Sequence, residues 1–443
     1  MTVAPTHADR DWLKRFRKTV AERLDELTAT VEEELGKPAF ETLTSELVPL
    51  LVACRWHEKH ARRWLRPRRL RGGSLWQLGQ SHRLHRVPWG RVAIIATWNY
   101  PLQLLGVQLV QAVMAGNAVV VKPSERCPKS QGLLLEMARA AGMNEARLSW
   151  TDADRAAGAK LLEEMRFDHV VFTGSTAVGR QIAERLASTL TPSTLELSGC
   201  DSALVLHDAD VELAAASIVY ALSLNAGATC MVPRRVIVSG AKFVAFVEAI
   251  RQQIAGGSAL DSYIQADWSG ARSAAREAVA GGGRWLDEAM DGEGWCRPLV
   301  VVEAPCEGKL AVGEHFGPAL AVIRAEDDAQ ARAIHHGFDQ HLATTVFTKS
   351  PHEAAWVNGT SLLTDGGGIV TVNDCVLPSA HPAAPLAGHG PSGWGVTRGG
   401  PGLQAMTRPV VVSQTGKFPR TPLRPPSEKT KDRIRRFVKW RYG

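Results

Sequence analysis

Short apolar runs that alternate with helical stretches constrain this chain more than any other feature of its sequence. Residues 91–97 (RVAIIAT) and 117–125 (NAVVVKPSE) read as buried strands, and a largely apolar helix ending at Gly116 separates them. Residues 168–188 then read as a strand, a glycine turn and a helix. Strands and helices that alternate at this spacing predict parallel βαβ units in a doubly wound sheet. Residues 9–65, ahead of the first strand, are predicted to form two polar-faced helices that cap this domain.

The composition is that of a globular protein of two or three domains. Its 443 residues are 45% apolar and 22% charged, so the chain can bury a large core. The apolar runs are strand-sized, far short of the roughly 20 residues that a transmembrane helix needs, and the N-terminus lacks the apolar segment of a signal peptide. We therefore expect a cytoplasmic protein. The seven cysteines are scattered without CxxC pairs or Cys/His clusters, so neither a metal site nor a disulfide framework is expected.

The positive charge is concentrated at the C-terminus. The formal net charge is +7, but residues 414–443 contain ten basic and two acidic residues, a net +8, which leaves −1 for residues 1–413. A nearly neutral body gives no reason to expect a nucleic-acid partner.

The basic tail begins as a proline-rich linker and ends in a possible helix. Ser427 suits a helix N-cap, and three apolar residues and one arginine follow at helical i, i+3, i+4, i+7 spacing: Ile434, Phe437, Val438 and Arg441. A helix this short is not stable alone in water and needs a surface. Three surfaces fit: a second copy of the chain, a separate acidic protein, or an anionic membrane.

Two glycine- and lysine-containing turns are candidates for binding a nucleotide. In FTGSTAVGR, Gly174 and Ser175 lie between a strand expected to end at Phe172 and a helix start, where free N–H groups favour a phosphate, and Gly179 lets that helix pack closely. In VVVKPSE, Lys122 and Glu125 follow a strand end, where ribose hydroxyls could bind. Taken alone, an ordinary turn explains the first segment equally well, and a solvated charged loop explains the second better.

Three further side chains carry possible chemistry. Asn99 ends a buried strand and could donate to an oxyanion, but it also suits a turn. Glu196 lies between two leucines, where burial would raise its pKa towards that of a general base. Cys230, in a loop of small residues, could be a nucleophile or a core filler, and no histidine adjoins it.

Taken together, the motifs resemble the aldehyde dehydrogenase superfamily, most closely its shorter class 3 branch. Six motifs occur in the expected order: TWNYP (97–101), GNAVVVKPSE (116–125), FTGSTAVGR (172–180), LELSG (195–199), NAGATC (225–230) and EHFGP (314–318). The resemblance implies that Cys230 is the nucleophile, Asn99 the oxyanion donor and Glu196 the base. It also implies a set of cofactor-binding residues: Thr97, Trp98, Lys122, Glu125, Gly174, Ser175, Gly179, Glu314 and Phe316.

The implied reaction is the oxidation of an aldehyde to a carboxylic acid through a cysteine thiohemiacetal and a thioester. The implied cofactor is NAD, with NADP possible, since Glu125 would repel a 2′-phosphate. A CoA-acylating relative would keep Cys230 but should lack the base that Glu196 provides, and a non-catalytic binding or structural role is the third alternative. The particular aldehyde is not readable from the sequence.

The resemblance also implies the domain organisation. The expected fold is α/β, with a doubly wound, parallel-sheet cofactor domain (1–197), an α/β catalytic domain (198–405) and a small β oligomerisation arm. The arm combines residues 73–88, which interrupt the first domain, with a strand at 406–416, and residues 417–443 form the basic tail. A homodimer that binds a small-molecule aldehyde is expected.

The sequence departs from the family pattern beside the site. The usual LELGGK is LELSGCDS, with Ser198 for glycine and Cys200 for lysine. The usual PFGG is PLAG (385–388), and GATC replaces GQTC. Cys200 could be a second thiol near the site or a small buried filler. Because of these substitutions, the family's pocket shape and turnover cannot be carried over to this chain, whereas its fold can.

Overall fold

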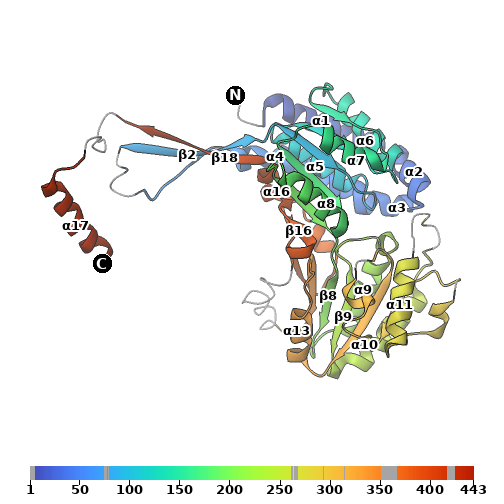
Figure 1. Cartoon of the computed structure of the whole chain (residues 1–443). Coiled ribbons are helices and arrows are strands. Elements are labelled where there is room, and N and C mark those ends of the chain that lie inside the picture. Colours follow the sequence, from blue (N-terminus) through green and yellow to red (C-terminus); the bar gives the residue numbers. More distant parts are fainter. Residues whose placement is uncertain are drawn as a thin grey trace.

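The structure is a computed structural model that describes residues 5–73, 77, 79–260, 263, 268–292, 294–313, 315–350, 367–416 and 425–443. These residues form two α/β lobes and a long two-stranded arm that projects from the body (Figure 1).

The helices are α1 (His7–Glu22), α2 (Leu24–Leu35), α3 (Ala39–Thr42), α4 (Val48–Leu65), α5 (Gln103–Met114), α6 (Pro128–Ala140), α7 (Arg155–Glu164), α8 (Thr176–Ala187), α9 (Val211–Ser223), α10 (Gly240–Gly256), α11 (Ser269–Ala280), α12 (Lys309–Val312), α13 (Asp328–His336), α16 (Gly399–Ala405) and α17 (Glu428–Tyr442). The strands are β1 (Arg68–Arg69), β2 (Gln80–Pro88), β3 (Arg91–Ile95), β4 (Ala118–Lys122), β5 (Leu148–Trp150), β6 (His169–Gly174), β7 (Ser193–Leu197), β8 (Asp201–Val205), β9 (Pro233–Ser239), β10 (Arg284–Trp285), β11 (Leu299–Val302), β12 (Ala319–Ala325), β13 (Ala343–Phe347), β14 (Ile369–Val372), β15 (Leu386–Ala387), β16 (Gly393–Trp394), β17 (Val396–Thr397) and β18 (Thr407–Thr415).

The first sheet is doubly wound, as the sequence predicts. Its strand order is β16-β7-β6-β3-β4-β5, with parallel neighbours except for the edge strand β16. Side chains of β3 alternate between its faces: Val92 and Ile94 join the core beneath α1, α4, α5 and α6, whereas Ala93 and Ile95 pack with α7 and α8. Helices therefore cover both faces. Strand β6 continues to Gly174, two residues beyond the predicted end at Phe172.

The N-terminal region differs from the two helices predicted over residues 9–65. It contains α1, α2 and α4, with α3 and a π-helical turn (Leu43–Leu47) between α2 and α4. Helix α2 ends at Gly36, which is left-handed (φ 69°), and Pro38 precedes α3, so the chain cannot continue as one helix. Glu46 in the π turn accepts hydrogen bonds from Lys37 Nζ and from the amide of Leu102, both 2.8 Å, and this fully buried pair joins the cap to the start of α5.

The second sheet has the order β10-β11-β12-β9-β8-β13-β14 and is parallel except for β10. Helices α9, α10 and α11 contribute to its largest core. The chain then returns to the first sheet, where β16 pairs with β7 opposite Glu196.

The arm is an antiparallel pair of strands distant in sequence. Strand β2 pairs with β18 from Pro88↔Thr407, next to the body, to Gln80↔Thr415 at the far end, and β1 adds a short edge. The expected arm began at residue 73; strand β2 begins at Gln80, and residues 74–76 and 78 lie outside the described residues. The valines Val411 and Val412 of β18 are each 52% exposed.

The tail contains the predicted helix, α17. Ser427 is its N-cap, and the Ser427 hydroxyl accepts a hydrogen bond from the amide of Thr430. Every residue of α17 is at least partly exposed. Among the described residues, no helix is both long enough and apolar enough to cross a lipid bilayer.

Candidate active site

A cavity of about 1040 Å³ receives side chains from both lobes and contains most of the candidate residues. Those that line it are Thr97, Trp98, Asn99, Lys122, Glu125, Gly174, Ser175, Glu196, Cys230 and Phe316. Glu314 lies outside the described residues. Gly179 lies behind the wall, where a Cβ would come 2.4 Å from Cδ2 of Leu197, so its absent side chain allows α8 to pack on β7.

The topology explains why these residues meet. Thr97 follows β3, Lys122 ends β4, Gly174 ends β6 and Glu196 lies near the end of β7. These neighbouring strands are parallel, so their carboxyl ends share one edge of the sheet, where open α/β sheets bind ligands. The site is thus a consequence of strand order.

The loop before Cys230 has an unusual backbone. Asn225 (φ 52°), Ala226 (φ 48°) and Gly227 (φ 76°) are all left-handed. A Cβ at Gly227 would come 2.4 Å from the backbone of Gly317, so only glycine fits. Asn225 Nδ2 donates to the carbonyls of Asn99 (2.7 Å) and Ala228 (3.1 Å), which fastens the loop to the strand end opposite.

A buried arginine also holds this loop in place through hydrogen bonds to its carbonyl groups. Arg234 is 1% exposed, and its guanidinium donates to the carbonyls of Gly227 (2.7 Å), Thr229 (3.1 Å) and Gly317 (2.7 Å). Burial lowers the pKa of Arg234 to about 10, so it stays cationic at neutral pH. No role of Arg234 or Asn225 was predicted from the sequence, although an arginine pair inside an apolar strand was a usable signal.

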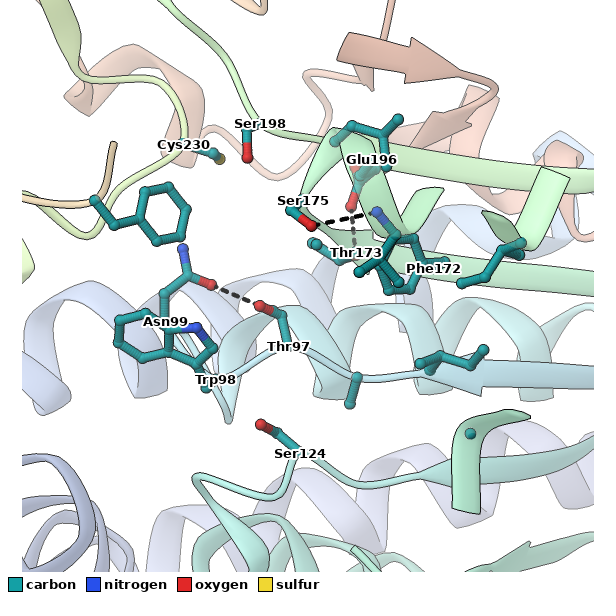
Figure 2. A pocket seen from close by; sticks show the side chains of 18 of the residues that line it. Thr97, Trp98, Asn99, Ser124, Phe172, Thr173, Ser175, Glu196, Ser198 and Cys230 are labelled. Carbon is teal, nitrogen blue, oxygen red and sulfur yellow. Dashed lines mark hydrogen bonds between the residues drawn. The ribbon is translucent and has the colours of Figure 1, made fainter. Parts of the chain in front are cut away.

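Asn99 is positioned to donate into the cavity. Its Oδ1 accepts from the Thr97 hydroxyl (3.1 Å), and its Nδ2 donates to the carbonyl of Ala228 (3.0 Å). A primary amide nitrogen has two N–H groups, so one remains for a ligand. Figure 2 shows this nitrogen pointing towards the space beside Cys230.

Cys230 is partly exposed to the cavity, but its thiol is strongly desolvated. Burial raises the pKa of Cys230 to about 12, and the negative charge of Glu196 adds to the effect, whereas Arg398 acts in the opposite direction. The thiol is therefore protonated at neutral pH and requires a base to become a nucleophile.

Glu196 has the environment of such a base. Burial raises its pKa, while the charge of Arg398 and three hydrogen bonds moderate the shift. The hydrogen-bond donors are the hydroxyl of Thr397, the hydroxyl of Thr173 (3.3 Å) and Nε2 of Gln108 (3.2 Å). These donors come from β17, β6 and α5, which local sequence patterns cannot bring together.

The cofactor end of the cavity combines charge, backbone donors and an aromatic pair. Lys122 Nζ donates to Glu125 (2.9 Å). Partial burial alone would raise the pKa of Glu125, but the hydrogen bond and charge of Lys122 outweigh it, and the pKa is lowered. The indole of Trp98 contacts the Phe316 ring edge to face, with centroids 5.9 Å apart, and the Arg126 guanidinium lies 3.5 Å from the Trp98 ring centroid. The sequence analysis missed Arg126 and Arg155, which also line the wall.

These residues fit a nicotinamide dinucleotide. Helix α8 begins at the cavity, with Gly174 and Ser175 at its N-terminus, so a pyrophosphate would meet free N–H groups there. Gly174 leaves no room for a side chain, since a Cβ would approach the Phe172 ring to 2.3 Å. Within the described part of the chain, no group of three histidine, cysteine or acidic residues could hold a metal ion.

The residues that differ from the family pattern lie in two environments: some line the cavity, and one lies in the core. Ser198 and Leu386 line the cavity. Cys200 is fully buried away from it: its thiol donates to the carbonyl of Ala311 (3.2 Å), and its sulfur accepts from Arg235 (3.2 Å). Cys200 is therefore a core residue and not a second active-site thiol.

Comparisons with known proteins show the family to which the chain belongs. A model of the aldehyde dehydrogenase family matches residues 4–412, so the chain belongs to that family. It is 29% identical to a 4,4'-diapolycopene aldehyde oxidase of Methylomonas sp over 93% of this chain and 78% of the relative. It is 28% identical to the aldehyde dehydrogenase family 3 protein comG of Dictyostelium discoideum, over 94% and 90%. The structure of a Mycobacterium tuberculosis aldehyde dehydrogenase complexed with NAD+ superposes with a TM-score of 0.85 at 24% identity, over 94% of this chain and 88% of that one. The chain is thus an NAD(P)-dependent enzyme that oxidises an aldehyde to a carboxylic acid.

Proposed function

We propose that Cys230 is the nucleophile of this oxidation, Asn99 its oxyanion donor and Glu196 its general base. The observation that carries the proposal is their convergence, from three separate segments, in the cavity that also holds the predicted cofactor residues. Glu196 counts against the CoA-acylating alternative, because a base for hydrolysis is present.

The proposed chemistry follows from these positions. Glu196 accepts the thiol proton through a water molecule and passes it to solvent before hydrolysis, while Cys230 Sγ adds to the aldehyde carbon. The oxyanion accepts hydrogen bonds from Asn99 Nδ2 and the amide of Cys230. The bound cofactor supplies the hydride acceptor. Water then attacks the thioester, Glu196 takes a proton from it, the C–S bond breaks, and the carboxylate leaves.

The test is NADH formation with a panel of aldehydes, with and without CoA. Cys230→Ala is expected to abolish turnover while folding and binding NAD normally, because only the covalent step is removed. Retained turnover in this variant, or a requirement for CoA, would overturn the assignment.

We infer that the preferred aldehyde is apolar. Leu342 and Leu386 line the cavity and belong to the apolar cluster that Cys230 packs against, and the name of the Methylomonas relative, 4,4'-diapolycopene aldehyde oxidase, supports the same class. A higher kcat/KM for decanal than for glyceraldehyde is the expected result, and the reverse order would contradict it.

We propose NAD rather than NADP as the preferred cofactor. Glu125 lines the cavity and its lowered pKa keeps it anionic, so it would repel a 2′-phosphate. Glu125→Gln should raise kcat/KM for NADP relative to NAD by about tenfold, equivalent to about 1.4 kcal/mol. A wild-type preference for NADP would show that Glu125 does not face the ribose.

We propose that the cofactor domain ends at residue 197 and that the catalytic domain begins at residue 198. We also propose that the protein is a homodimer and lies in the cytoplasm, as the family pattern implies. In this proposal β2 and β18 form the contact of a cytoplasmic homodimer, and the exposed valines of β18 support that role.

We propose further that α17 binds an anionic membrane surface. Seven basic and two acidic residues surround a narrow apolar stripe in which Ile434 and Phe437 are half-buried. Trp440 and Tyr442, 79% and 68% exposed, flank that stripe, as suits a membrane interface. Residues 1–413 have a net charge of −1, so they attract this basic helix only weakly. Each Lys or Arg near an anionic membrane contributes about 1 kcal/mol to the binding free energy.

A further inference from the structure

Ser198 presents a hydroxyl to the cavity at the position where the family pattern has glycine. The residue is 6% exposed, and within the described part of the chain its hydroxyl has no hydrogen-bond partner. The backbone of Ser198 is fixed, because its carbonyl accepts from Gln340 Nε2 (2.6 Å) and from the Ser392 hydroxyl (3.0 Å). An unpaired hydroxyl on a fixed backbone is available to a ligand or to water.

This hydroxyl lies between the two proposed reacting groups. Figure 2 shows Ser198 with its oxygen pointing into the space that Cys230 borders on one side and Glu196 on the other. The next residue, Gly199, lies against Cys230, since a Cβ there would come 2.5 Å from the Cys230 carbonyl oxygen.

The spacing along the chain suits a single water molecule. The Cα atoms of Glu196 and Ser198, two residues apart, are separated by no more than about 7 Å, the longest span of two residues, and both residues line the cavity. A water molecule between them can hydrogen-bond to both. Glu196 is itself held in place by Thr397, Thr173 and Gln108, so the water must be brought to its carboxylate.

We propose that Ser198 is a positioning residue for the water that hydrolyses the Cys230 thioester. The Ser198 hydroxyl hydrogen-bonds to this water, which attacks the thioester carbon. One water proton goes to Glu196, the C–S bond breaks towards the Cys230 sulfur, and the carboxylic acid leaves. This inference rests on the proposed function and concerns only its second half.

The experiment separates acylation from hydrolysis. Enzyme is mixed with NAD and one equivalent of decanal, quenched at intervals, and the acyl-enzyme is followed by intact-protein mass spectrometry while NADH is followed by absorbance. Ser198→Ala is expected to give an NADH burst at the wild-type rate and acyl-enzyme decay about tenfold slower, the effect of one lost hydrogen bond. Ser198→Thr keeps the hydroxyl and should restore the decay rate. Ser198→Gly should be less impaired than Ser198→Ala, because a second water can fill the space.

Two control variants test whether the effect is specific to Ser198 and whether the acyl-enzyme forms. Ser379→Ala removes the hydroxyl of an equally buried serine (6% exposed) outside the cavity and should change neither rate. Glu196→Gln should accumulate the acyl-enzyme. Wild-type decay in Ser198→Ala, or a slowed burst with normal decay, overturns the role of Ser198 alone. The absence of any acyl-enzyme in the wild type and in Glu196→Gln would instead refute the proposed function.

Discussion

At the scale of single residues, the protonation of Cys230 links the structure to reactivity. With a pKa of about 12, roughly one thiol in 10,000 is ionised at pH 8, because burial disfavours the charged form. Inactivation by iodoacetamide without cofactor should therefore accelerate about tenfold for each pH unit between pH 7 and 10.

The measurement is residual activity against time at each pH. Mass-spectrometric labelling of Cys230→Ala controls for the partly exposed Cys296 and Cys306. A rate that is already constant near pH 8 would show that the free enzyme holds a preformed thiolate.

At the scale of elements, the three left-handed residues Asn225, Ala226 and Gly227 determine where Cys230 lies. In Gly227→Ala the new methyl group would collide with the backbone at Gly317 and also retain the unfavourable φ of 76°. We expect a loss of about 2 kcal/mol or more in the free energy of unfolding, and a fall in kcat of tenfold or more as Cys230 shifts.

Gly132 provides a matched control. It lies inside α6, where an added Cβ meets no atom within 4 Å, so Gly132→Ala should leave kcat unchanged and raise stability by up to about 1 kcal/mol. Thermal unfolding and steady-state kinetics measure both effects. Equal stability of the two variants would contradict the steric argument.

Elements with a clear local pattern were predictable from sequence. The apolar run of β3 and the glycine turn before α8 were sufficient for the doubly wound sheet and for its binding edge. Two helices were predicted over residues 9–65, whereas the chain breaks both at Arg23, between α1 and α2, and at Gly36, after α2. The pairing of β2 with β18 came only from the family resemblance, since no periodicity links strands so far apart.

The site was predictable to the extent that its residues fall within motifs. Cys230, Asn99 and Glu196 were named from the sequence and share one cavity. The groups that hold them were not: Thr397, Gln108 and Arg234 act through tertiary contacts. A side chain's role as a supporting donor depends on what the fold places beside it, which its neighbours in sequence do not reveal.

At the scale of the whole molecule, the tail can be separated from catalysis. It leaves β18 at the end of the arm farthest from the body, and no residue of α17 is buried. A chain ending at Gly416 should keep the wild-type kcat for a water-soluble aldehyde and the oligomeric state of the full chain, but should lose binding to vesicles containing phosphatidylglycerol.

Sedimentation with anionic and with purely zwitterionic vesicles measures this binding, and Trp440→Ser in the full chain should weaken it without changing the net charge. If the full chain sediments with neither kind of vesicle, the membrane proposal is wrong. If the shortened chain is folded and dimeric yet inactive, the tail belongs to the active site.

The arm also affects how the protein is made. Strand β2 leaves the ribosome early, but its partner β18 follows only after about 320 further residues, roughly 15 to 60 s later at 5–20 residues per second. During that time β2 is an open strand edge that can pair with neighbouring nascent chains. A prematurely terminated product never closes this edge, so completion of the last strand distinguishes a finished subunit from a fragment prone to aggregation.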